Sequence, residues 1–303
     1  MEQLYLVGKN IAHSVSPAMY AALYNKLGLD WRYEAVDLAS DKDARRFLDS
    51  NDWLSANATT PYKQFAADLA SVKAASVQLS GGANMLFRAN EQIVGLNTDG
   101  IGCVRAIQQE GFSFQDGRVV VCGTGPTSLA IVAAAAQAGA ARVALIGRSR
   151  DRTKEVLEAF LTRYKKLAYA TFDFEPVRPD ERSFRSAYEE PSFVFGSYET
   201  STQEIAGADI LIDATPLGMN AGDPAPFAEN LLKSQQLVFD VVYAQGDSQL
   251  LRAARAAGVP AFDGRTMVVA QAVENAIVLL NQCEVPHELS WDEMFDLMSA
   301  AAQ

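Results

Sequence analysis

The 303-residue sequence predicts an α/β protein made of two domains. Strand-like and helix-like segments alternate through residues 2–63, which is typical of an α/β layered domain. Near residue 100 the pattern restarts, and residues 117–147 have the order strand, glycine loop, helix and strand. A chain of this length usually forms two domains of about 100–200 residues each.

The first domain begins with a short strand and a helix. Residues 2–8 are mostly apolar and end at Gly8, and residues 16–29 have apolar side chains at helical spacing. Ser16 is the expected N-cap of that helix, and Pro17 lies in its first turn. The remaining segments are expected to be strands at 32–38 and 53–59, a helix after the N-cap Ser40, and a helix after Lys63.

The second domain contains one complete βαβ unit. Residues 117–122 and 142–147 are continuous apolar runs of strand length, separated by a glycine loop and an alanine-rich helix. About 30 residues are enough for such a parallel crossover. Further strands of the buried type are expected at 208–215, 236–243 and 259–262, and they predict a Rossmann-type, doubly wound domain.

The domain boundaries follow from these patterns. We expect the Rossmann-type domain to span residues 103–263, with two helical segments beyond it that return to the first domain. The first domain then comprises residues 1–102 together with 264–303. The stretch 167–202 fits neither period, and we interpret it as an insertion that forms a hairpin or a surface excursion; its sequence assigns it no role.

The charge balance excludes some classes of partner. The chain has 26 Lys and Arg against 37 Asp and Glu, a net charge of −11. Such a protein is repelled by nucleic acids and by anionic membranes, so we expect neither as a partner. Its three cysteines are isolated and form no disulfide or zinc pattern, so we expect no metal and a reducing compartment. Without a signal peptide or a span-length apolar stretch, the expected location is cytoplasmic.

The glycine loop points to a dinucleotide. Gly123 and Gly125 are the first two glycines of a G-x-G-x-x-G pattern, with Ser128 as the small third residue. Gly123 would permit the tight turn, Gly125 a close approach of the backbone to a pyrophosphate, and the following helix N-terminus would favour its negative charge. The alternative is a plain turn between strand and helix, although the position between both elements is the one that the binding mechanism requires.

Arginines follow the second strand of this unit. An NAD site usually carries Asp or Glu there, whereas guanidinium groups suit the 2′-phosphate of NADP. Arg148 and Arg152 lie four residues apart at the start of the next helix and could hold one phosphate between them. The alternative is a solvated basic turn. The arginines favour NADP.

Polar residues in the first domain form a second constellation. They occur in the segments HSVSP (13–17), NATTPYK (57–63), GGAN (81–84) and NTDG (97–100), at the ends of expected strands or in the loops after them. Their hydroxyls, amides, ammonium and carboxylate suit a small polyhydroxylated acid. Each residue also has a structural explanation: Ser16 as an N-cap, Asn97 and Asp99 as turn formers, Lys63 as a surface lysine.

In this order, the motifs resemble those of the shikimate dehydrogenase family. The family pattern is H-S-x-S-P, N-V-T-x-P-x-K, G-A-x-N-T, N-T-D-G, G-x-G-G-A, N-R-S/T, N-A/S-T-P-x-G-M and D-G-x-x-M-x-x-x-Q. This chain has HSVSP, NATTPYK, GGANM, NTDG, GTGPT, GRS, DATPLGM and DGRTMVVAQ. The resemblance covers nearly the whole length apart from 167–202. It implies an N-terminal α/β substrate domain followed by a Rossmann-type NADP-binding domain.

The resemblance also implies the role of individual residues. The family's catalytic lysine and its partner aspartate fall on Lys63 and Asp99. Its substrate-binding positions match Ser14, Ser16, Asn57, Thr59, Asn84, Tyr243 and Gln271. Its cofactor-binding positions match Gly123, Thr124, Gly125, Pro126, Thr127, Arg148, Ser149, Arg152, Thr215, Met219 and Gly264.

The implied activity is the reversible, NADP-dependent reduction of 3-dehydroshikimate to shikimate, on the chorismate pathway of aromatic amino acid biosynthesis. Oxidation of a secondary alcohol sends a hydride to the cofactor and the hydroxyl proton to a base. Lys63 alone or the Lys63–Asp99 pair could be that base, and the sequence does not separate the two. In the reduction, the Lys63 ammonium would stabilise the developing alkoxide.

Some positions depart from the family pattern. Met85 replaces a threonine and is expected to remove a hydroxyl near the substrate, and Gly147 replaces an asparagine that could contact the adenosine. Alternatives therefore remain: a quinate/shikimate dehydrogenase using NAD or NADP, a related enzyme with a shifted substrate, or a non-catalytic NADP-binding sensor. The expected partner is a small molecule, and the chain is expected to be a monomer or a homodimer.

Overall fold

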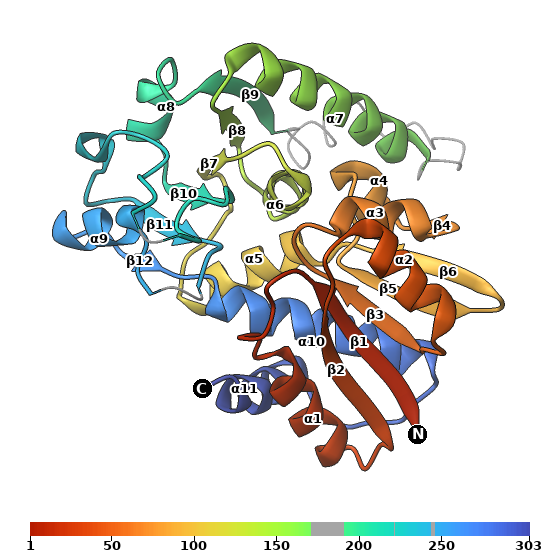
Figure 1. Ribbon diagram of the computed structural model, residues 1–303. Coiled ribbons are helices and arrows are strands. Elements are labelled where there is room, and N and C mark those ends of the chain that lie inside the picture. The colour runs from red at the N-terminus through yellow and green to blue at the C-terminus, as the bar shows by residue number, and fades with distance from the viewer. Residues whose placement is uncertain (171–190, 221, 244–245) are drawn as a thin grey trace, which may run out of the picture. The chain divides into compact units, whose positions relative to one another are not determined.

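The computed structural model describes residues 1–170, 191–220, 222–243 and 246–303, without the side chains of 168–170. The chain divides into two compact units (Figure 1). Unit 1 comprises Met1–Ala106 with Arg265–Gln303, and unit 2 comprises Ile107–Gly264. Helix α5 (Asp99–Gln109) crosses both this first division and the one we expected at 102/103.

Unit 1 is built on a mixed six-stranded sheet in the order β2-β1-β3-β5-β6-β4. β1 runs parallel to β2 and β3, whereas β5 is antiparallel to both β3 and β6. The short β4 pairs parallel with β6. The strands are β1 (Glu2–Gly8), β2 (Trp31–Asp37), β3 (Ser55–Ala58), β4 (Val72–Lys73), β5 (Met85–Ala89) and β6 (Gln92–Leu96).

Helices cover both faces of this sheet because β1 alternates its side chains between two cores (Figure 1). Leu4 and Leu6 pack with α1 (Ser16–Lys26), α10 (Arg265–Gln282) and α11 (Trp291–Ala301). Tyr5 and Val7 pack in the second core. That core includes side chains from α2 (Asp41–Ser50), α3 (Lys63–Leu69) and α4 (Ala75–Ser80).

Two expected N-caps have different outcomes. Ser40 caps α2, and its hydroxyl accepts the Asp43 N–H at 3.2 Å. The expectation for Ser16 is wrong, because α1 begins at Ser16 itself and Val15 occupies the cap position. Val15 already has helical backbone angles, φ −80° and ψ −10°, so Ser16 lies inside the first turn. Its hydroxyl is therefore not used as a cap.

Unit 2 contains a parallel six-stranded sheet in the order β12-β11-β10-β7-β8-β9. Numbered within this unit, the strands follow the order 6-5-4-1-2-3 of a Rossmann sheet. The fold prediction is therefore confirmed. The strands are β7 (Arg118–Cys122), β8 (Arg142–Gly147), β9 (Ser192–Ser197), β10 (Ile210–Asp213), β11 (Leu237–Asp240) and β12 (Ala261–Phe262).

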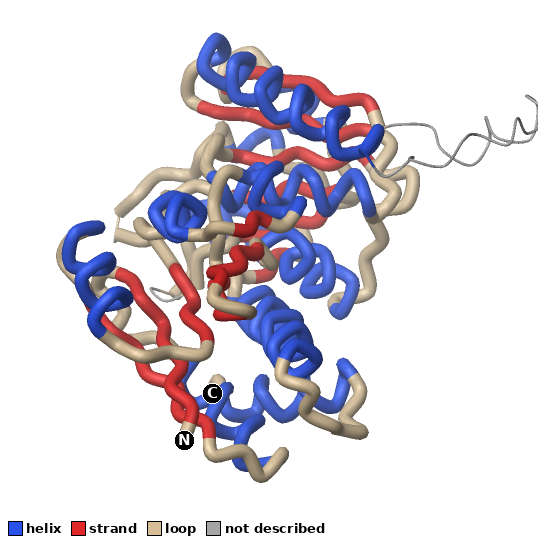
Figure 2. Tube along the Cα trace, turned by 90° about the vertical axis from the view of Figure 1, so that its right-hand side faces the viewer, coloured by secondary structure: helices blue, strands red, loops and turns tan. Residues whose placement is uncertain are grey.

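Helices flank the strands of unit 2, as they do in unit 1 (Figure 2). They are α6 (Pro126–Gln137), α7 (Arg150–Ala170), α8 (Thr202–Ala206), η1 (Glu229–Leu231) and α9 (Gln249–Ala256). The apolar face of β10 and β11 packs against α9 through Leu250, Leu251 and Ala254. Across the described ranges, none of the helices combines the length and the apolar character of a membrane span.

The stretch 167–202 is only in part an insertion. α7 extends to Ala170, and β9 pairs in parallel with β8, so both ends of this stretch belong to the Rossmann framework. Phe193 of β9 contacts Phe160 and Tyr164 of α7 edge to face, so this end of the stretch packs on the preceding helix. Residues 171–190, the centre of the expected hairpin or excursion, lie outside the described residues.

Candidate active site

An ion pair lies at the centre of the polar constellation in unit 1. Lys63 is the first residue of α3 and Asp99 the first residue of α5. The Lys63 Nζ lies 2.6 Å from Asp99 Oδ2, and the two side chains are only 16% and 1% exposed. A helix N-terminus favours the Asp99 carboxylate but disfavours the Lys63 ammonium. The Asp99 carboxylate therefore offsets the unfavourable placement of the Lys63 ammonium at a helix N-terminus.

Asn84 joins this pair to its surroundings. Its Nδ2 lies 3.0 Å from Asp99 Oδ1, 2.9 Å from Thr98 Oγ1 and 3.2 Å from Gln271 Oε1. The Thr98 N–H donates to Asn84 Oδ1 at 2.9 Å, which fixes the orientation of the amide. An amide nitrogen has two hydrogens for these three acceptors. The longest contact, to Gln271, is therefore the easiest to exchange for a ligand.

The Asp99 backbone is held as firmly as its side chain. Asn97 Oδ1 accepts the Asp99 N–H at 3.0 Å. The Asn97 amide in turn donates to Ser80 Oγ at 3.0 Å and to the Gly82 carbonyl at 2.9 Å. Asn97 is thus a turn former, as the structural alternative proposed, and it positions the carboxylate of Asp99.

Asn57, at the end of β3, is fixed by an aromatic neighbour. Its Nδ2 donates to the Asn84 carbonyl at 3.0 Å, and its Oδ1 accepts the Tyr33 hydroxyl at 2.9 Å. Tyr33 stacks on Tyr20 with ring centroids 4.2 Å apart. Burial raises the pKa of Tyr33 well above its ordinary value, so its hydroxyl remains a donor.

Gln271 approaches this network because α5 and α10 pack closely. A Cβ atom on Gly102 would lie 2.8 Å from Gln271 Cβ and 3.0 Å from its backbone nitrogen. Only a glycine at this position of α5 leaves room for α10 as it stands. One turn further along α10, Asn275 Oδ1 accepts the Thr98 hydroxyl at 2.9 Å.

Ser14 and Thr59 lie in loops at one edge of the sheet, and Ser16 is the first residue of α1, which follows the loop after β1. β1 and β3 are adjacent and parallel, so the loops that follow them begin side by side. The three side chains are half-buried. The loop after β1 is anchored where the Ile11 N–H donates to Asp37 Oδ2 at 3.1 Å, and the Ser16 N–H donates to Ser14 Oγ at 3.3 Å.

Met85 does not belong to this polar group. Its side chain is fully buried in the core that contains Tyr20, Tyr33 and Val273. The expectation that this substitution removes a hydroxyl near a substrate stays a prediction. Successive residues of a strand point to opposite faces, and the side chain of position 85 falls on the apolar side.

The glycine loop of unit 2 has the geometry of an anion-binding turn. Gly123 has φ +109°, and a Cβ there would lie 2.6 Å from Ser128 Oγ and 2.9 Å from the Ala214 carbonyl. Gly125 is the N-cap of α6, and a Cβ at this position would meet no atom within 4 Å. Thr124, Pro126 and Thr127 complete the turn, which exposes the N-terminus of α6 to a phosphate.

The predicted 2′-phosphate residues lie after β8 and in the first turn of α7. Arg148, Ser149 and Arg152 are all exposed. Arg152 pairs with Glu155 at 3.1 Å, an exposed pair of the kind that contributes little and can exchange its partner. A Cβ on Gly147 would lie 2.6 Å from Thr153 Oγ1, so a larger residue at this position requires Thr153 to move.

Four other predicted residues occupy loops after β10, β11 and β12. Thr215 is buried and its Oγ1 accepts the Leu217 N–H at 3.1 Å, whereas Met219 is 47% exposed. Tyr243 is half-buried after β11. A Cβ on Gly264 would lie within 2.1 Å of the Val241 carbonyl, so the chain needs a glycine there.

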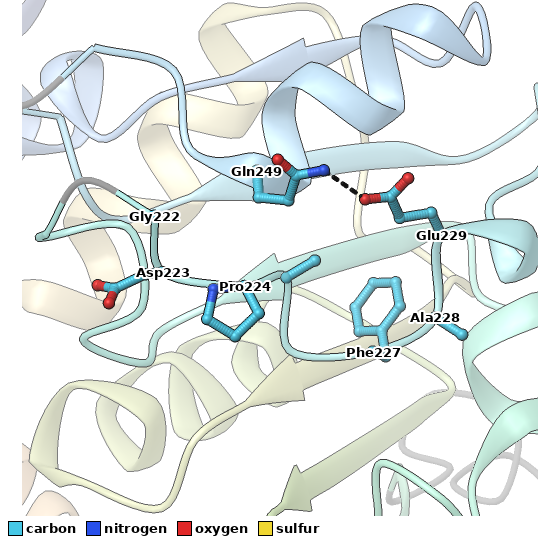
Figure 3. Close-up of a pocket in the computed structure, with 8 residues that line it drawn as sticks. Gly222, Asp223, Pro224, Phe227, Ala228, Glu229 and Gln249 are labelled. Carbon is cyan, nitrogen blue, oxygen red and sulfur yellow. Dashed lines mark hydrogen bonds between the residues drawn. The ribbon is translucent and has the colours of Figure 1, made fainter.

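A pocket of about 440 Å³ lies elsewhere in unit 2 and contains none of the predicted site residues (Figure 3). Glu229 and Gln249 face each other across it, joined by a 2.6 Å hydrogen bond. We assign it no function. In the part of the chain that the structure describes, no group of three or more His, Cys, Asp or Glu could hold a metal ion.

Comparison with known proteins identifies the family. The family described as "Shikimate dehydrogenase substrate binding domain" matches residues 6–86. The shikimate dehydrogenase (NADP(+)) of Rubrobacter xylanophilus is 31% identical over 274 residues, which cover 89% of this chain and 87% of the relative. That of Geobacter metallireducens is 29% identical, covering 93% and 92%. The chain belongs to the shikimate dehydrogenase family.

Solved structures share the fold of this family member. A shikimate dehydrogenase from Thermus thermophilus, in complex with NADP(H) and shikimate, has a TM-score of 0.76 at 23% identity and covers 99% of this chain and 100% of its own. A quinate dehydrogenase from Corynebacterium glutamicum, in complex with NAD, has a TM-score of 0.76 at 24% identity and covers 98% of each chain. At these identities the likeness shows the fold alone.

The structure thus brings Lys63, Asp99, Asn84, Asn57 and Gln271 of this shikimate dehydrogenase family member into one hydrogen-bonded group. It also adds residues that sequence reasoning missed. These are Tyr33, Ser80 and Asn275, whereas Thr98 belongs to the NTDG segment that the sequence already pointed to. Asn275 had a detectable signal, because a polar side chain one turn after Gln271 interrupts an otherwise apolar helix face.

Thr98→Val tests how strongly the network is coupled. The change keeps the shape and the backbone N–H but leaves Asn275 Oδ1 without its donor, so we expect the free energy of unfolding to fall by about 1–3 kcal/mol. Urea denaturation measures this. Thr60→Val is the control. Because Thr60 is exposed, this change should alter the free energy of unfolding by no more than about 0.5 kcal/mol. Equal stability of the two variants would contradict the coupling.

Proposed function

We propose that this chain is an NADP-dependent shikimate dehydrogenase that reversibly reduces 3-dehydroshikimate to shikimate. The curated relatives named above carry this activity in their names, and they cover nearly the whole chain. The observation that carries the proposal is the buried Lys63–Asp99 pair inside a network of amides and hydroxyls. Such a group of donors and acceptors suits a small hydroxylated acid.

Lys63 is the proposed acid and base. Bound NADPH would supply the hydride for the carbonyl carbon of the substrate. The Lys63 ammonium stabilises the negative charge that develops on the carbonyl oxygen and gives that oxygen its proton. In the oxidation the same nitrogen accepts the hydroxyl proton. Asp99 orients Lys63 through their 2.6 Å ion pair.

The neutral polar groups are the proposed substrate contacts. Gln271 can release its long contact to Asn84 and turn its amide to a substrate hydroxyl. Asn57, Asn84 and Thr59 offer further contacts at the ends of β3 and before β5. Hydroxyls of Ser14 and Ser16 are the proposed donors to the substrate carboxylate, which suits a chain whose net charge repels anions at long range.

Residues of the Rossmann sheet are the proposed cofactor contacts. The open position at Gly125 and the free N-terminus of α6 fit a pyrophosphate. Arg148, Ser149 and Arg152 fit a 2′-phosphate. Thr215, Met219, Tyr243 and Gly264 are proposed near the nicotinamide. We accordingly propose residues 1–102 with 264–303 as the substrate-binding domain and 103–263 as the dinucleotide-binding domain.

Lys63→Met tests the catalytic assignment. The wild type should oxidise shikimate with NADP⁺, followed by NADPH absorbance, and should prefer it to quinate. The variant should lose about 10²–10⁴ in kcat, because it lacks the acid and base. Its affinity for NADP⁺ should be unchanged, which would show that it is folded. Lys73→Met, at an exposed lysine of the same unit, should keep full turnover. Turnover of the Lys63 variant at the wild-type rate would contradict the assignment.

Arg148→Ala tests cofactor selection. Loss of a charge-assisted contact to the 2′-phosphate should weaken NADP⁺ binding about tenfold or more and leave NAD⁺ binding unchanged. Arg150→Ala is the matched control, because the Arg150 guanidinium lies 4.9 Å above the Phe195 ring. Calorimetric titration measures both. An equal loss for NAD⁺ and NADP⁺ would show that Arg148 does not select the phosphate.

A further inference from the structure

Two buried carboxyl groups lie next to each other at the end of the Rossmann sheet. Asp213 and Asp240 are the last residues of β10 and β11, and the two strands pair in parallel with these residues in register. Residues in register on adjacent strands present their side chains on the same face, about 4.8 Å apart. The two residues are 1% and 0% exposed.

Their hydrogen bonds leave one oxygen without a donor. Asp213 Oδ1 accepts the Thr215 N–H at 2.9 Å, and Asp240 Oδ1 accepts the Val242 N–H at 2.9 Å. Asp240 Oδ2 is buried and accepts no hydrogen bond from the described residues. A buried acceptor without a donor is costly. The candidate donors are the Ser248 hydroxyl, which lowers the pKa of Asp240, and a proton on the neighbouring carboxyl group.

No basic side chain in the described ranges forms an ion pair with either group. The titratable groups nearby are Cys122 at the end of β7, Tyr198 after β9 and Asp263 after β12. Burial raises the pKa of Cys122 and of Tyr198 well above the ordinary values, so both stay neutral. Neither can compensate two carboxylates.

The carboxyl groups respond to this environment. Burial, followed by the charge of Asp240, raises the pKa of Asp213 to about 7. Burial raises the pKa of Asp240 to about 6, against the opposing effect of Ser248 and the Val242 amide. Two like charges this close cannot both ionise freely, and their protons belong to the pair.

The pair lies under two loops that carry proposed cofactor residues. Asp213 caps the turn leading to Thr215, and Asp240 caps the turn leading to Tyr243. The loops are further joined where the Val241 N–H donates to the Asp213 carbonyl at 3.0 Å. The family pattern quoted above has asparagine at position 213, which would donate to Asp240 without any titration. Aspartate can do so only when a proton is present.

We propose that Asp213 and Asp240 share one proton, which holds together the loops carrying Thr215 and Tyr243, so that losing it weakens cofactor binding. Asp213 is thus a positioning residue that makes this site sensitive to pH. The statement about binding rests on the proposed function. The shared proton itself does not, and it can be measured without any cofactor.

Stability against pH tests the shared proton. A carboxyl pKa raised from about 3.9 in the unfolded chain to about 7 in the fold means that the folded state binds the extra proton between these values. The contribution of Asp213 to the free energy of unfolding is therefore fully present at low pH. It is lost as the pH rises through the folded-state pKa of about 7. Asp213→Asn removes the titration and keeps a donor for Asp240.

The experiment compares melting temperatures of the full chain from pH 5 to pH 8.5. The melting temperature of Asp213→Asn minus that of the wild type should increase by at least about 3 °C between pH 5 and pH 8. Asp209→Asn is the matched control, because Asp209 is exposed and directly precedes β10. This variant should show the same pH dependence of the melting temperature as the wild type. A difference between Asp213→Asn and wild type that stays constant with pH would overturn the shared proton.

Cofactor affinity tests the link to the loops. The Kd for NADP⁺ is measured for both proteins at each pH, and their ratio cancels the titration of the cofactor's own phosphate. The wild type should bind as tightly as Asp213→Asn at pH 6 and about fivefold or more weakly at pH 8.5. If the ratio of the two Kd values does not change with pH, the shared proton does not affect cofactor binding. The melting temperatures still test whether the proton is shared. If neither protein binds NADP⁺ at any pH, the proposed function fails and the melting data still decide the proton.

Discussion

The buried ion pair between Lys63 and Asp99 is the constraint on which the rest of unit 1 depends. Burying a charged pair is favourable only when the remaining lone pairs and hydrogens find partners. Asp99 meets this condition through Asn84, which donates to its Oδ1, and through Asn97, which accepts its backbone N–H. Each of these partners is held by further hydrogen bonds, so the polar groups form one connected hydrogen-bond network.

This network explains why the sheet is mixed. Asn84 must lie beside Asn57 at the end of β3 and also beside Thr98 after β6. The antiparallel strand β5 begins at this edge, whereas β3 and β6 end there. Residues from one strand start and two strand ends therefore meet at one point. A fully parallel sheet would bring only strand ends to that edge.

Unit 2 uses strand ends in the same way, with a different electrostatic outcome. Asp213 and Asp240 each cap the turn after their strand, as Asn97 does in unit 1. In unit 1 the carboxylate meets an ammonium and an amide, so it can remain charged. In unit 2 the two carboxyl groups lie in register on adjacent strands, and the proposed shared proton lets both stay buried.

Sequence patterns predicted five of the six strands of the Rossmann sheet, because β7, β8, β10 and β11 are mostly buried apolar runs. They missed β9, whose strand is only partly buried and lies in the stretch interpreted as an insertion. They missed the hairpin of β5 and β6, whose turn residues Asn90 and Glu91 have φ +48° and +64° without a glycine to mark them. They also missed Tyr33, since its role depends on a contact with Asn57 across the sheet. Contacts between distant segments leave no periodic signal, so the supporting residues needed the structure.

The most direct test of the central claim is a double-mutant cycle on kcat with Lys63→Met, Asp99→Asn and the double variant. If the two side chains act as one unit, kcat of the double variant should equal kcat of the less active single variant. Losses that multiply would mean that Lys63 and Asp99 act independently. That result would contradict the account.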